Sequence, residues 1–329
     1  MLLSTIFMFD HLAREIVARL KSASSVGLVF HFRPDPDSLG SGAALAAFLE
    51  AQGIPYFFYC ISGVADDARL FDIDPTRVLS LTQMCTANLE IVCTFDAGDI
   101  KFAGLDWLMT SDNFRRKPLL INFDHHVTNT RYGDINVIDT ECSSTTEVMY
   151  KFFKALDWKI TKRVAQYLLA GILVDTDHFS NPATTSASLT VAADLLSHGA
   201  PLLQLRQFLF ERRGLSALRF IGEVLSRLRK NPRYNLAVTY LTDEDIKNHG
   251  LNGEEIEGLS NILNLLGDVK AMLLLKGGKD IIRGSLRTTS PEVDVGRLAE
   301  VFGGGGHRKA AGFTVTGTLQ NTERGLQVI

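Results

Sequence analysis

The side chains best suited to metal or proton chemistry stand where short apolar segments end. Asp124, His125 and His126 follow the apolar run PLLINF, and Asp96 follows the run LEIVCTF. The other candidates lie near the first apolar run or end a helical pattern: His31, Asp35, Asp37 and Asp175. Carboxylates and imidazoles bind divalent cations, and imidazoles also transfer protons at neutral pH. The sequence therefore indicates a metal or acid–base site.

The donor types narrow the choice of metal. Oxygen and imidazole donors without thiolates favour manganese, magnesium or cobalt over structural zinc. The number of donors favours two ions. Two ions about 3.5–4 Å apart can activate a water molecule and hold both reacting oxygens of a phosphate. Phosphoester hydrolysis is therefore the predicted chemistry.

Each candidate also has a structural interpretation. A single aspartate after a strand is usually a turn former or a helix cap. Asp37 in particular could cap a helix that starts near Ser38. Caps and turns do not require histidine, however, and three separate strands are followed by such donors. The convergence on one sheet edge favours a functional site.

A parallel sheet is the element expected to position these donors. Four apolar runs rich in β-branched and aromatic residues predict buried strands: 27–32, 55–60, 89–95 and 118–123. Residues 38–53 form an alanine-rich helical pattern that ends at Gly53, so the first two strands belong to a βαβ unit. Ligands of an open α/β sheet gather outside the carboxyl ends of its strands. The candidates follow those ends.

The rest of the chain predicts a helical segment and then a smaller α/β domain. Helical patterns occupy 144–156, 161–174, 185–199, 201–211 and 215–230. Strand patterns follow at 235–241, 269–277 and 280–288, with helical patterns at 254–266 and 295–302. We therefore predict a catalytic domain over residues 1–200, a helical linker over 201–232 and a second domain over 233–329.

Composition describes an ordinary globular protein. The chain has 329 residues, 46% of them hydrophobic and 22% charged, which favours two domains. A net charge of −3 argues against a broad basic surface for long duplex nucleic acid. The apolar opening lacks a basic start and predicts an N-terminal helix, and no later run approaches the roughly 20 residues of a membrane span. We expect a cytoplasmic protein without a membrane partner.

The cysteines predict no disulfide. Cys60, Cys85, Cys93 and Cys142 have no C-x-x-C spacing. Without a secretion signal, disulfides are uncommon. All four are therefore expected to be small buried side chains.

The ordered motifs resemble those of the DHH phosphoesterase family. HFRPDPDSLGS, TFDAGD, NFDHHVTN and GILVDTDHF occur in the order of its four metal-binding motifs. GSLRT followed by FGGGGHRKAAGF is similar to the C-terminal domain associated with that family. The resemblance extends from about His31 to Phe313 and is greatest to bacterial nanoRNases, which hydrolyse oligoribonucleotides and pAp. It implies a metal site in a cleft between the two domains.

The resemblance also implies a set of metal ligands. These are His31, Asp35, Asp37, Asp96, His125 and Asp175. Asp96 would bridge two ions, with His31 and Asp35 on one ion and the other three ligands on the second. Manganese is the expected metal, with magnesium or cobalt as alternatives.

Three residues are expected to take part in catalysis: Asp96, His125 and His126. His126 would face the substrate phosphate, and Asp124 would orient a histidine without binding metal itself. Two positions depart from the common family pattern. Pro36 replaces a frequent glycine and is expected to stiffen its loop. Relatives commonly read Asp-Thr-Gly in the fourth motif, whereas Thr176, Asp177 and His178 follow Asp175 here. Asp177 and His178 are expected to point to solvent, with an effect on the second metal as the alternative.

The C-terminal signature predicts a phosphate or nucleotide clamp. A glycine run alone is weak evidence and could be only a turn. Here it precedes His307, and Arg287 lies on a predicted strand. The expected substrate-binding residues are His126, Arg287, Gly304, Gly305, Gly306 and His307. Arg308 and Lys309 are expected to be a solvated basic rim, and Ser285 to be structural.

Several functions remain open on the sequence alone. The main prediction is hydrolysis of short oligoribonucleotides, with pAp as a further substrate, by a metal-activated water. The alternative is a phosphodiesterase for cyclic di-AMP or linear pApA. A non-catalytic nucleotide-binding scaffold is less favoured, since the motif ligands are intact. A single-strand exonuclease is also less favoured, since the net acidic chain does not support an extended basic groove for longer strands. The expected partner is short RNA or a small nucleotide, and a homodimer is possible.

Overall fold

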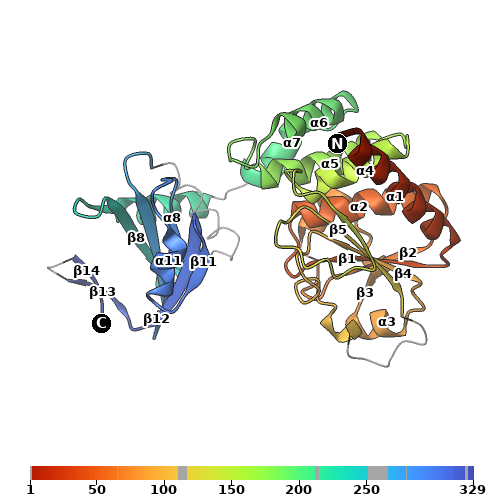
Figure 1. Ribbon diagram of the computed structural model, residues 1–329. Helices are drawn as coiled ribbons and strands as arrows, with labels where there is room; N and C mark the ends of the chain where they lie inside the picture. The colour runs from red at the N-terminus through yellow and green to blue at the C-terminus, as the bar shows by residue number, and fades with distance from the viewer. Residues whose placement is uncertain are drawn as a thin grey trace. The chain divides into compact units, whose positions relative to one another are not determined.

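A computed structural model describes most of the chain in two compact units. The described residues are 2–64, 66–109, 117–211, 215–250, 266–278, 280–322 and 325–329. Unit 1 comprises Met1–Glu211 and unit 2 comprises Arg212–Ile329. Both are α/β structures (Figure 1).

A six-stranded parallel sheet forms the centre of unit 1, in the order β3-β2-β1-β4-β5-β6. The strands are β1 (Val26–Phe30), β2 (Tyr56–Tyr59), β3 (Val78–Leu79), β4 (Ile91–Phe95), β5 (Leu119–Asp124) and β6 (Ile135–Ile138). The four predicted strands are confirmed. The sequence did not predict the edge strands β3 and β6, which are short and only partly buried.

Helices cover both faces of this sheet. They are α1 (Leu2–Ser22), α2 (Pro36–Ala51), α3 (Leu81–Thr86), α4 (Thr145–Ala155), α5 (Lys162–Asp175), α6 (Ser186–Ser197) and α7 (Leu202–Arg206). Figure 1 shows α3 on the opposite side of the sheet from α2 and α5. Alternate strand residues pack accordingly: Phe30 and Phe95 lie in the core with α2, while Val29 and Val92 lie in a second core with Met84 of α3. Burial on both faces explains the continuous apolar runs.

The described part of unit 1 also contains three short 3₁₀ helices and a π-helical turn. The 3₁₀ helices are Asp66–Phe71, Pro75–Arg77 and Asp106–Met109. The π-helical turn, Gln207–Glu211, ends the predicted 201–211 helix.

Asp37 does not cap α2, which was the structural interpretation that the sequence left open for it. Asp35 is the N-cap, and its side chain accepts hydrogen bonds from the N–H groups of Asp37, at 2.9 Å, and Ser38, at 3.1 Å. Pro36 follows at the first helical position, where its missing N–H costs nothing. Because Asp35 caps the helix, the Asp37 side chain is available for other contacts.

Unit 2 contains a mixed sheet in the order β11-β12-β10-β9-β8-β7. Its strands are β7 (Arg229–Asn231), β8 (Leu236–Thr242), β9 (Ala271–Gly277), β10 (Ile281–Arg287), β11 (Gly305–His307) and β12 (Ala310–Thr316), and a separate hairpin joins β13 (Leu319–Thr322) to β14 (Gly325–Val328). Its described helices are α8 (Leu215–Ser226), α9 (Asp243–His249) and α11 (Val295–Glu300). The predicted helix at 254–266 falls almost wholly outside the described residues.

The segment expected to be a linker is divided between the units. Leu205 of α7 belongs to the main core of unit 1. Phe220 and Val224 of α8 pack with Leu241 and Met272 of unit 2. The predicted helix at 215–230 ends at Ser226, and the chain continues as β7.

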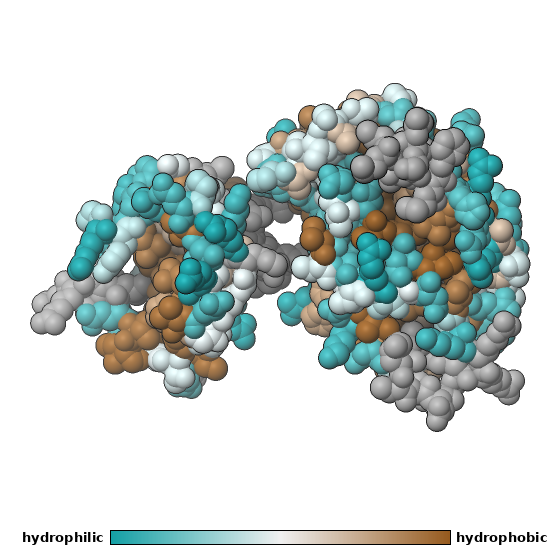
Figure 2. All heavy atoms as spheres, viewed as in Figure 1, coloured by the Kyte–Doolittle hydropathy of each residue, from teal (hydrophilic) through white to brown (hydrophobic). Residues whose placement is uncertain are grey.

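The surface and the thiols follow the composition with one exception. Among the described residues, no helix is long and apolar enough to cross a bilayer. On the face shown in Figure 2, hydrophilic residues are interspersed among apolar ones in each unit. All four cysteines are free, and Cys60, Cys93 and Cys142 are buried as predicted. Cys85 is partly exposed because it lies on the short helix α3.

Candidate metal centre

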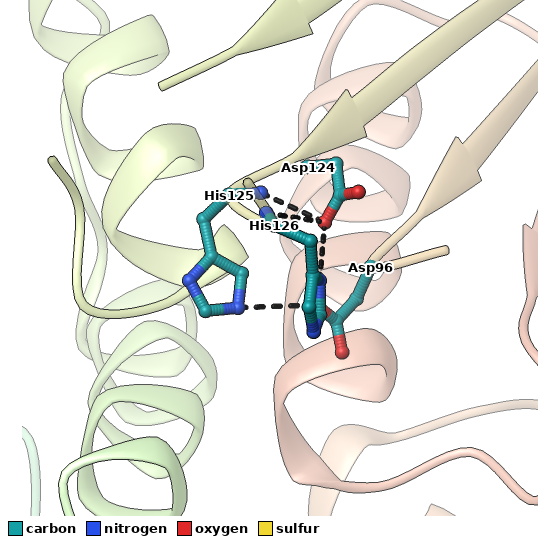
Figure 3. A group of neighbouring side chains, drawn as sticks. All are labelled: Asp96, Asp124, His125 and His126. Atoms are coloured by element: carbon teal, nitrogen blue, oxygen red, sulfur yellow. Dashed lines mark hydrogen bonds and ion pairs between the residues drawn. The ribbon is translucent and has the colours of Figure 1, made fainter. Parts of the chain in front are cut away.

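The carboxyl ends of three adjacent strands bring the candidate ligands together. His31 follows β1. Asp96 follows β4, and Asp124 ends β5 just before His125 and His126 (Figure 3). Asp96 has a left-handed backbone, with φ of 59°, and its N–H donates to the carbonyl of Phe123 at 3.0 Å. A non-glycine residue in this region is a local strain of the kind found at functional sites.

Two groups of donor atoms share this edge. One contains His31, Asp35 and Asp96, and the other contains Asp37, His125 and Asp175. The donor atoms of each group lie within 4.8 Å of one another. These are the two sets that the resemblance implies, with every member brought into place by the fold.

Asp96 faces both groups. Its Oδ2 lies 3.5 Å from His31 Nε2, and its Oδ1 lies 3.5 Å from His125 Nε2. His31 Nε2 is also 3.7 Å from Asp35 Oδ1, and His125 Nε2 is 3.2 Å from Asp175 Oδ2. A carboxylate with one oxygen toward each group has the geometry of a bridging ligand.

These separations suit metal ligands. Most exceed the 2.7–3.2 Å of an N–H···O hydrogen bond. Neighbouring ligands of an octahedral ion with bonds of about 2.1 Å stand about 3 Å apart. Oxygen and imidazole donors at such spacing fit two hard or borderline divalent cations.

The charge of the cluster also fits cations. Burial opposes protonation of His31, but Asp35 and Asp96 outweigh it and raise the pKa of His31 to about 10. Burial likewise opposes protonation of His125, whose pKa Asp175 and Asp96 raise to about 12. The carboxylates therefore strongly favour positive charge at the centre. Bound metal would supply that charge and release protons from the histidines, because only neutral imidazole is a ligand.

The carboxylates respond to their surroundings in different directions. Burial and the neighbouring Asp175 and Asp96 raise the pKa of Asp37. Burial also raises the pKa of Asp175, to about 6, although His125 opposes this shift. Burial acts in the same sense on Asp96, but His125 and His31 outweigh it and lower the pKa of Asp96. Asp96 therefore keeps its charge most firmly, as a bridging ligand requires.

Asp124 contacts the histidines through one oxygen. Its Oδ1 accepts from the N–H of His125 at 2.8 Å, from the N–H of His126 at 3.2 Å and from His126 Nδ1 at 2.8 Å (Figure 3). Its Oδ2 accepts from the Asn129 amide. These contacts raise the pKa of His126, chiefly through the Asp124 hydrogen bond. With Nδ1 donating to Asp124, Nε2 of the half-exposed His126 is left for other contacts.

Two residues after Asp175 behave differently from each other. Asp177 is exposed, in agreement with the sequence analysis. His178 is partly buried, in contrast to the expectation of a solvent-directed side chain. Asp177, His178 and Phe179 all have left-handed backbones, so the chain turns back at the end of α5.

Two threonines that were not predicted from the sequence contact the centre. Thr145 donates to Asp96 and Asp37, and Thr146 donates to Asp37. The polar run CSSTTE before a helical pattern was the available signal. By itself that run indicates only a helix start.

The substrate-binding candidates of unit 2 lie on neighbouring strands. Arg287 of β10 pairs with Ala310 of β12, which pairs with His307 of β11, so the three stand in one row of the sheet. Arg308 and Lys309 are exposed, and Ser285 is partly buried.

Packing explains part of the glycine run. A Cβ at Gly304 would overlap the carbonyl oxygen of Gly312, and one at Gly306, where φ is 144°, would overlap the backbone of β12. Close approach of β11 to β12 therefore requires these two glycines, whereas the sequence suggested that the whole run serves ligand approach. Among the described residues, a Cβ at Gly305 would meet no other atom within 4 Å, so packing does not explain this glycine.

Comparison with known proteins agrees with this arrangement. The DHH family N-terminal domain matches residues 25–172, and the DHHA1 domain matches residues 233–329. The bifunctional oligoribonuclease and PAP phosphatase NrnA of Bacillus subtilis is 24% identical over 318 residues, covering 92% of each chain. The Thermus thermophilus protein of that name is 28% identical over 289 residues, covering 87% of this chain and 83% of the relative.

A solved structure shares the fold. An exopolyphosphatase-related protein from Bacteroides fragilis superposes with a TM-score of 0.79 at 24% identity, covering 92% of this chain and 90% of the other. The motifs, the two matched domains and this fold agree. The chain therefore contains a DHH family N-terminal domain over residues 25–172 and a DHHA1 domain over residues 233–329.

Proposed function

We propose that this protein is a metal-dependent phosphoesterase that hydrolyses short oligoribonucleotides, and also pAp, to mononucleotides. The observation that carries the proposal is the position of Asp96 between two complete donor groups. The names of the Bacillus subtilis and Thermus thermophilus relatives supply the substrate class.

The residues of the centre would bind the metal ions. His31, Asp35, Asp37, Asp96, His125 and Asp175 would hold two divalent cations, with manganese favoured over magnesium or cobalt. When bound, such ions lower the pKa of a water molecule and neutralise charge on the phosphate. Asp96 would hold the two ions at a fixed separation.

His126 would contact the substrate phosphate. Its Nδ1 is held by Asp124, so its Nε2 is directed by a buried hydrogen bond and its side chain remains 45% exposed. A raised pKa favours the protonated ring, which would donate to a phosphate oxygen.

Unit 2 would bind another part of the nucleotide. Arg287 offers a guanidinium for a phosphate, and His307 stands in the same row of the sheet. We propose that these residues and the backbone of Gly304, Gly305 and Gly306 bind the substrate. The net charge of −3 supports short ligands, since long single strands are usually held in an extended basic groove.

The test is hydrolysis as a function of substrate length. We expect kcat/KM to be greatest for about two to five nucleotides and to decline steeply toward about 24 nucleotides, at fixed manganese and salt. Asp96→Asn should lose several orders of magnitude in rate while remaining folded, because water activation and phosphate alignment fail together.

Other outcomes would replace the proposal. A flat or rising length profile would identify an exonuclease for longer strands. Preference for cyclic di-AMP or linear pApA would identify a phosphodiesterase of signalling nucleotides. Near wild-type activity of metal-replete Asp96→Asn would remove the bridging role.

A further inference from the structure

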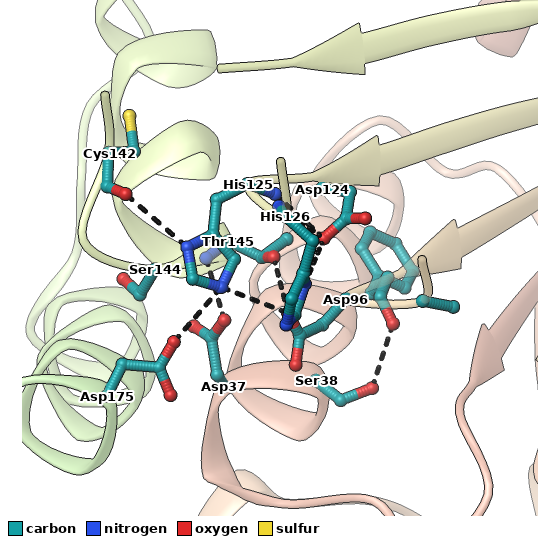
Figure 4. A network of polar contacts seen from close by, with 12 residues as sticks. Asp37, Ser38, Asp96, Asp124, His125, His126, Cys142, Ser144, Thr145 and Asp175 are labelled. Atoms are coloured by element: carbon teal, nitrogen blue, oxygen red, sulfur yellow. Dashed lines mark hydrogen bonds and ion pairs between the residues drawn. The ribbon is translucent and has the colours of Figure 1, made fainter. Parts of the chain in front are cut away.

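The first turn of α4 donates four hydrogen bonds to two of the candidate metal ligands. Figure 4 shows Thr145 beside both carboxylates, those of Asp37 and Asp96. Asp37 Oδ2 accepts from the Thr145 N–H at 2.7 Å. Asp37 Oδ1 accepts from the N–H of Thr146 at 2.8 Å and from its hydroxyl at 2.7 Å. Asp96 Oδ1 accepts from the Thr145 hydroxyl at 2.9 Å.

All these groups are buried, so each bond has consequences. Asp37, Thr145 and Thr146 have no exposed surface, and Asp96 is 4% exposed. A buried carboxylate without partners would be strongly unfavourable, and the first N–H groups of a helix also lack partners within the helix. The four bonds satisfy both requirements and hold each carboxylate in one rotation.

The Thr145 hydroxyl acts on the bridging carboxylate. It binds Asp96 Oδ1, the oxygen that faces His125, while Oδ2 faces His31. Rotation of this carboxylate would break the Thr145 bond and move both oxygens away from their groups. The hydroxyl therefore fixes the plane of the carboxylate, with one oxygen toward each donor group.

The same segment also contacts a histidine of the centre. The carbonyl of Cys142 accepts from His125 Nδ1 at 3.4 Å, which leaves Nε2 toward Asp96 and Asp175 (Figure 4). Residues 142–146 thus contact ligands that follow β1, β4 and β5.

We propose that Thr145 and Thr146 are positioning residues of the metal centre, which orient the carboxylates of Asp96 and Asp37 for metal binding. This inference rests on the metal-dependent part of the proposed function. The competing interpretation is that Asp37 only caps α4 from outside the helix. In that case loss of a hydroxyl would lower stability without a specific effect on metal affinity.

The test compares hydroxyl removal with hydroxyl retention. Thr145→Val and Thr146→Val keep the side-chain shape but remove the donor, whereas Thr145→Ser and Thr146→Ser keep the donor. Thr239→Val is the matched control, because Thr239 is a 1% exposed threonine of unit 2 whose hydroxyl donates to the carbonyl of Val224. Manganese affinity is measured on the full chain, without substrate, by calorimetry and by the electron paramagnetic resonance signal of free Mn²⁺.

We expect Thr145→Val to weaken manganese binding about 10- to 100-fold, as is usual for residues that orient metal ligands. Thr146→Val should cause a smaller loss, since the Thr146 N–H still holds Asp37. Both serine variants and Thr239→Val should bind manganese like the wild type.

Wild-type affinity in both valine variants would overturn the inference, and so would an equal loss in Thr239→Val. If Thr145→Val does not fold, Thr145→Ala compared with Thr145→Ser gives the same decision. The manganese affinity is measured without substrate. It therefore tests the positioning role even if the protein does not hydrolyse the proposed substrates.

Discussion

Asp124 shows how one buried side chain can set the chemistry of its neighbours. It has no exposed surface, and its Oδ1 accepts from two backbone N–H groups and one imidazole. These bonds fix the turn after β5 and the ring of His126. The same carboxylate also lies near Asp96 and the two histidines in a group that could itself hold a metal. A substitution at Asp124 can distinguish a role in orienting His126 from a role as a metal ligand.

We predict that Asp124→Asn lowers kcat/KM about 10- to 100-fold while the protein still binds its full complement of manganese. The reason is that an amide at this position must turn an N–H₂ group toward either His126 or the Asn129 amide, both of which donate to Asp124. Kinetics and metal analysis on the same sample are the measurement. Asp134→Asn is the control, because Asp134 accepts from the Leu120 N–H instead. Loss of metal in Asp124→Asn would contradict the prediction, because Asp124 would then act on metal binding and not only on the orientation of His126.

Residue type explains which members of the centre could be foreseen. Histidine and aspartate after apolar runs stand out, because few structural roles demand both. Thr145 and Thr146 do not stand out, since hydroxyl residues are normal at a helix start. Their partner Asp37 lies 108 and 109 positions away in the sequence. Only the fold brings such a pair together.

At the scale of elements, α5 contributes to the centre through two residues one turn apart. Asp175 ends the helix as a candidate ligand, and Gly171 lies four residues earlier. A Cβ at Gly171 would overlap Asp37 Oδ1 and Thr146 Oγ1. The absence of a side chain at Gly171 therefore leaves room for the Asp37–Thr146 contact.

We predict that Gly171→Ala destabilises unit 1 by about 1–3 kcal/mol and weakens manganese binding, because the added methyl group displaces the Asp37 carboxylate. Helix propensity alone would give the opposite sign, a gain of up to about 1 kcal/mol. Gly222→Ala on α8 is the matched control, since a Cβ there has no neighbour within 4 Å among the residues that the structure describes. Urea unfolding and calorimetry measure the two effects. A stabilised Gly171→Ala with unchanged metal affinity would contradict the prediction.

The elements that the sequence predicted are those with the strongest burial. Runs such as 91–95 are buried at every position, so they differ clearly from their surroundings. β6 has only one buried residue, and β3 has two residues in all, so neither produces a pattern. The start of α2 was misplaced because three polar residues compete there as caps. Backbone geometry determines which of these residues caps the helix, and the residue types alone do not.

At the scale of the whole molecule, the candidate metal centre belongs entirely to unit 1. All six candidate ligands precede Glu211, and unit 2 has cores of its own. Metal bound at this centre should therefore stabilise unit 1 directly. The chain also contains a convenient reporter, because its two tryptophans, Trp107 and Trp158, both lie in unit 1.

We predict that metal removal lowers the melting temperature reported by tryptophan fluorescence and leaves a second transition unchanged. At a metal concentration 100 times Kd, binding stabilises the folded state by about 2.7 kcal/mol. For a domain of this size that corresponds to a shift of about 5–10 °C. Far-UV circular dichroism, which reports both units, should contain the shifted transition and one that does not move with chelator. Asp96→Asn, which removes a candidate metal ligand, should show little or no shift in melting temperature when metal is removed. Equal shifts in fluorescence and in the whole dichroism signal would mean that the two units unfold as one.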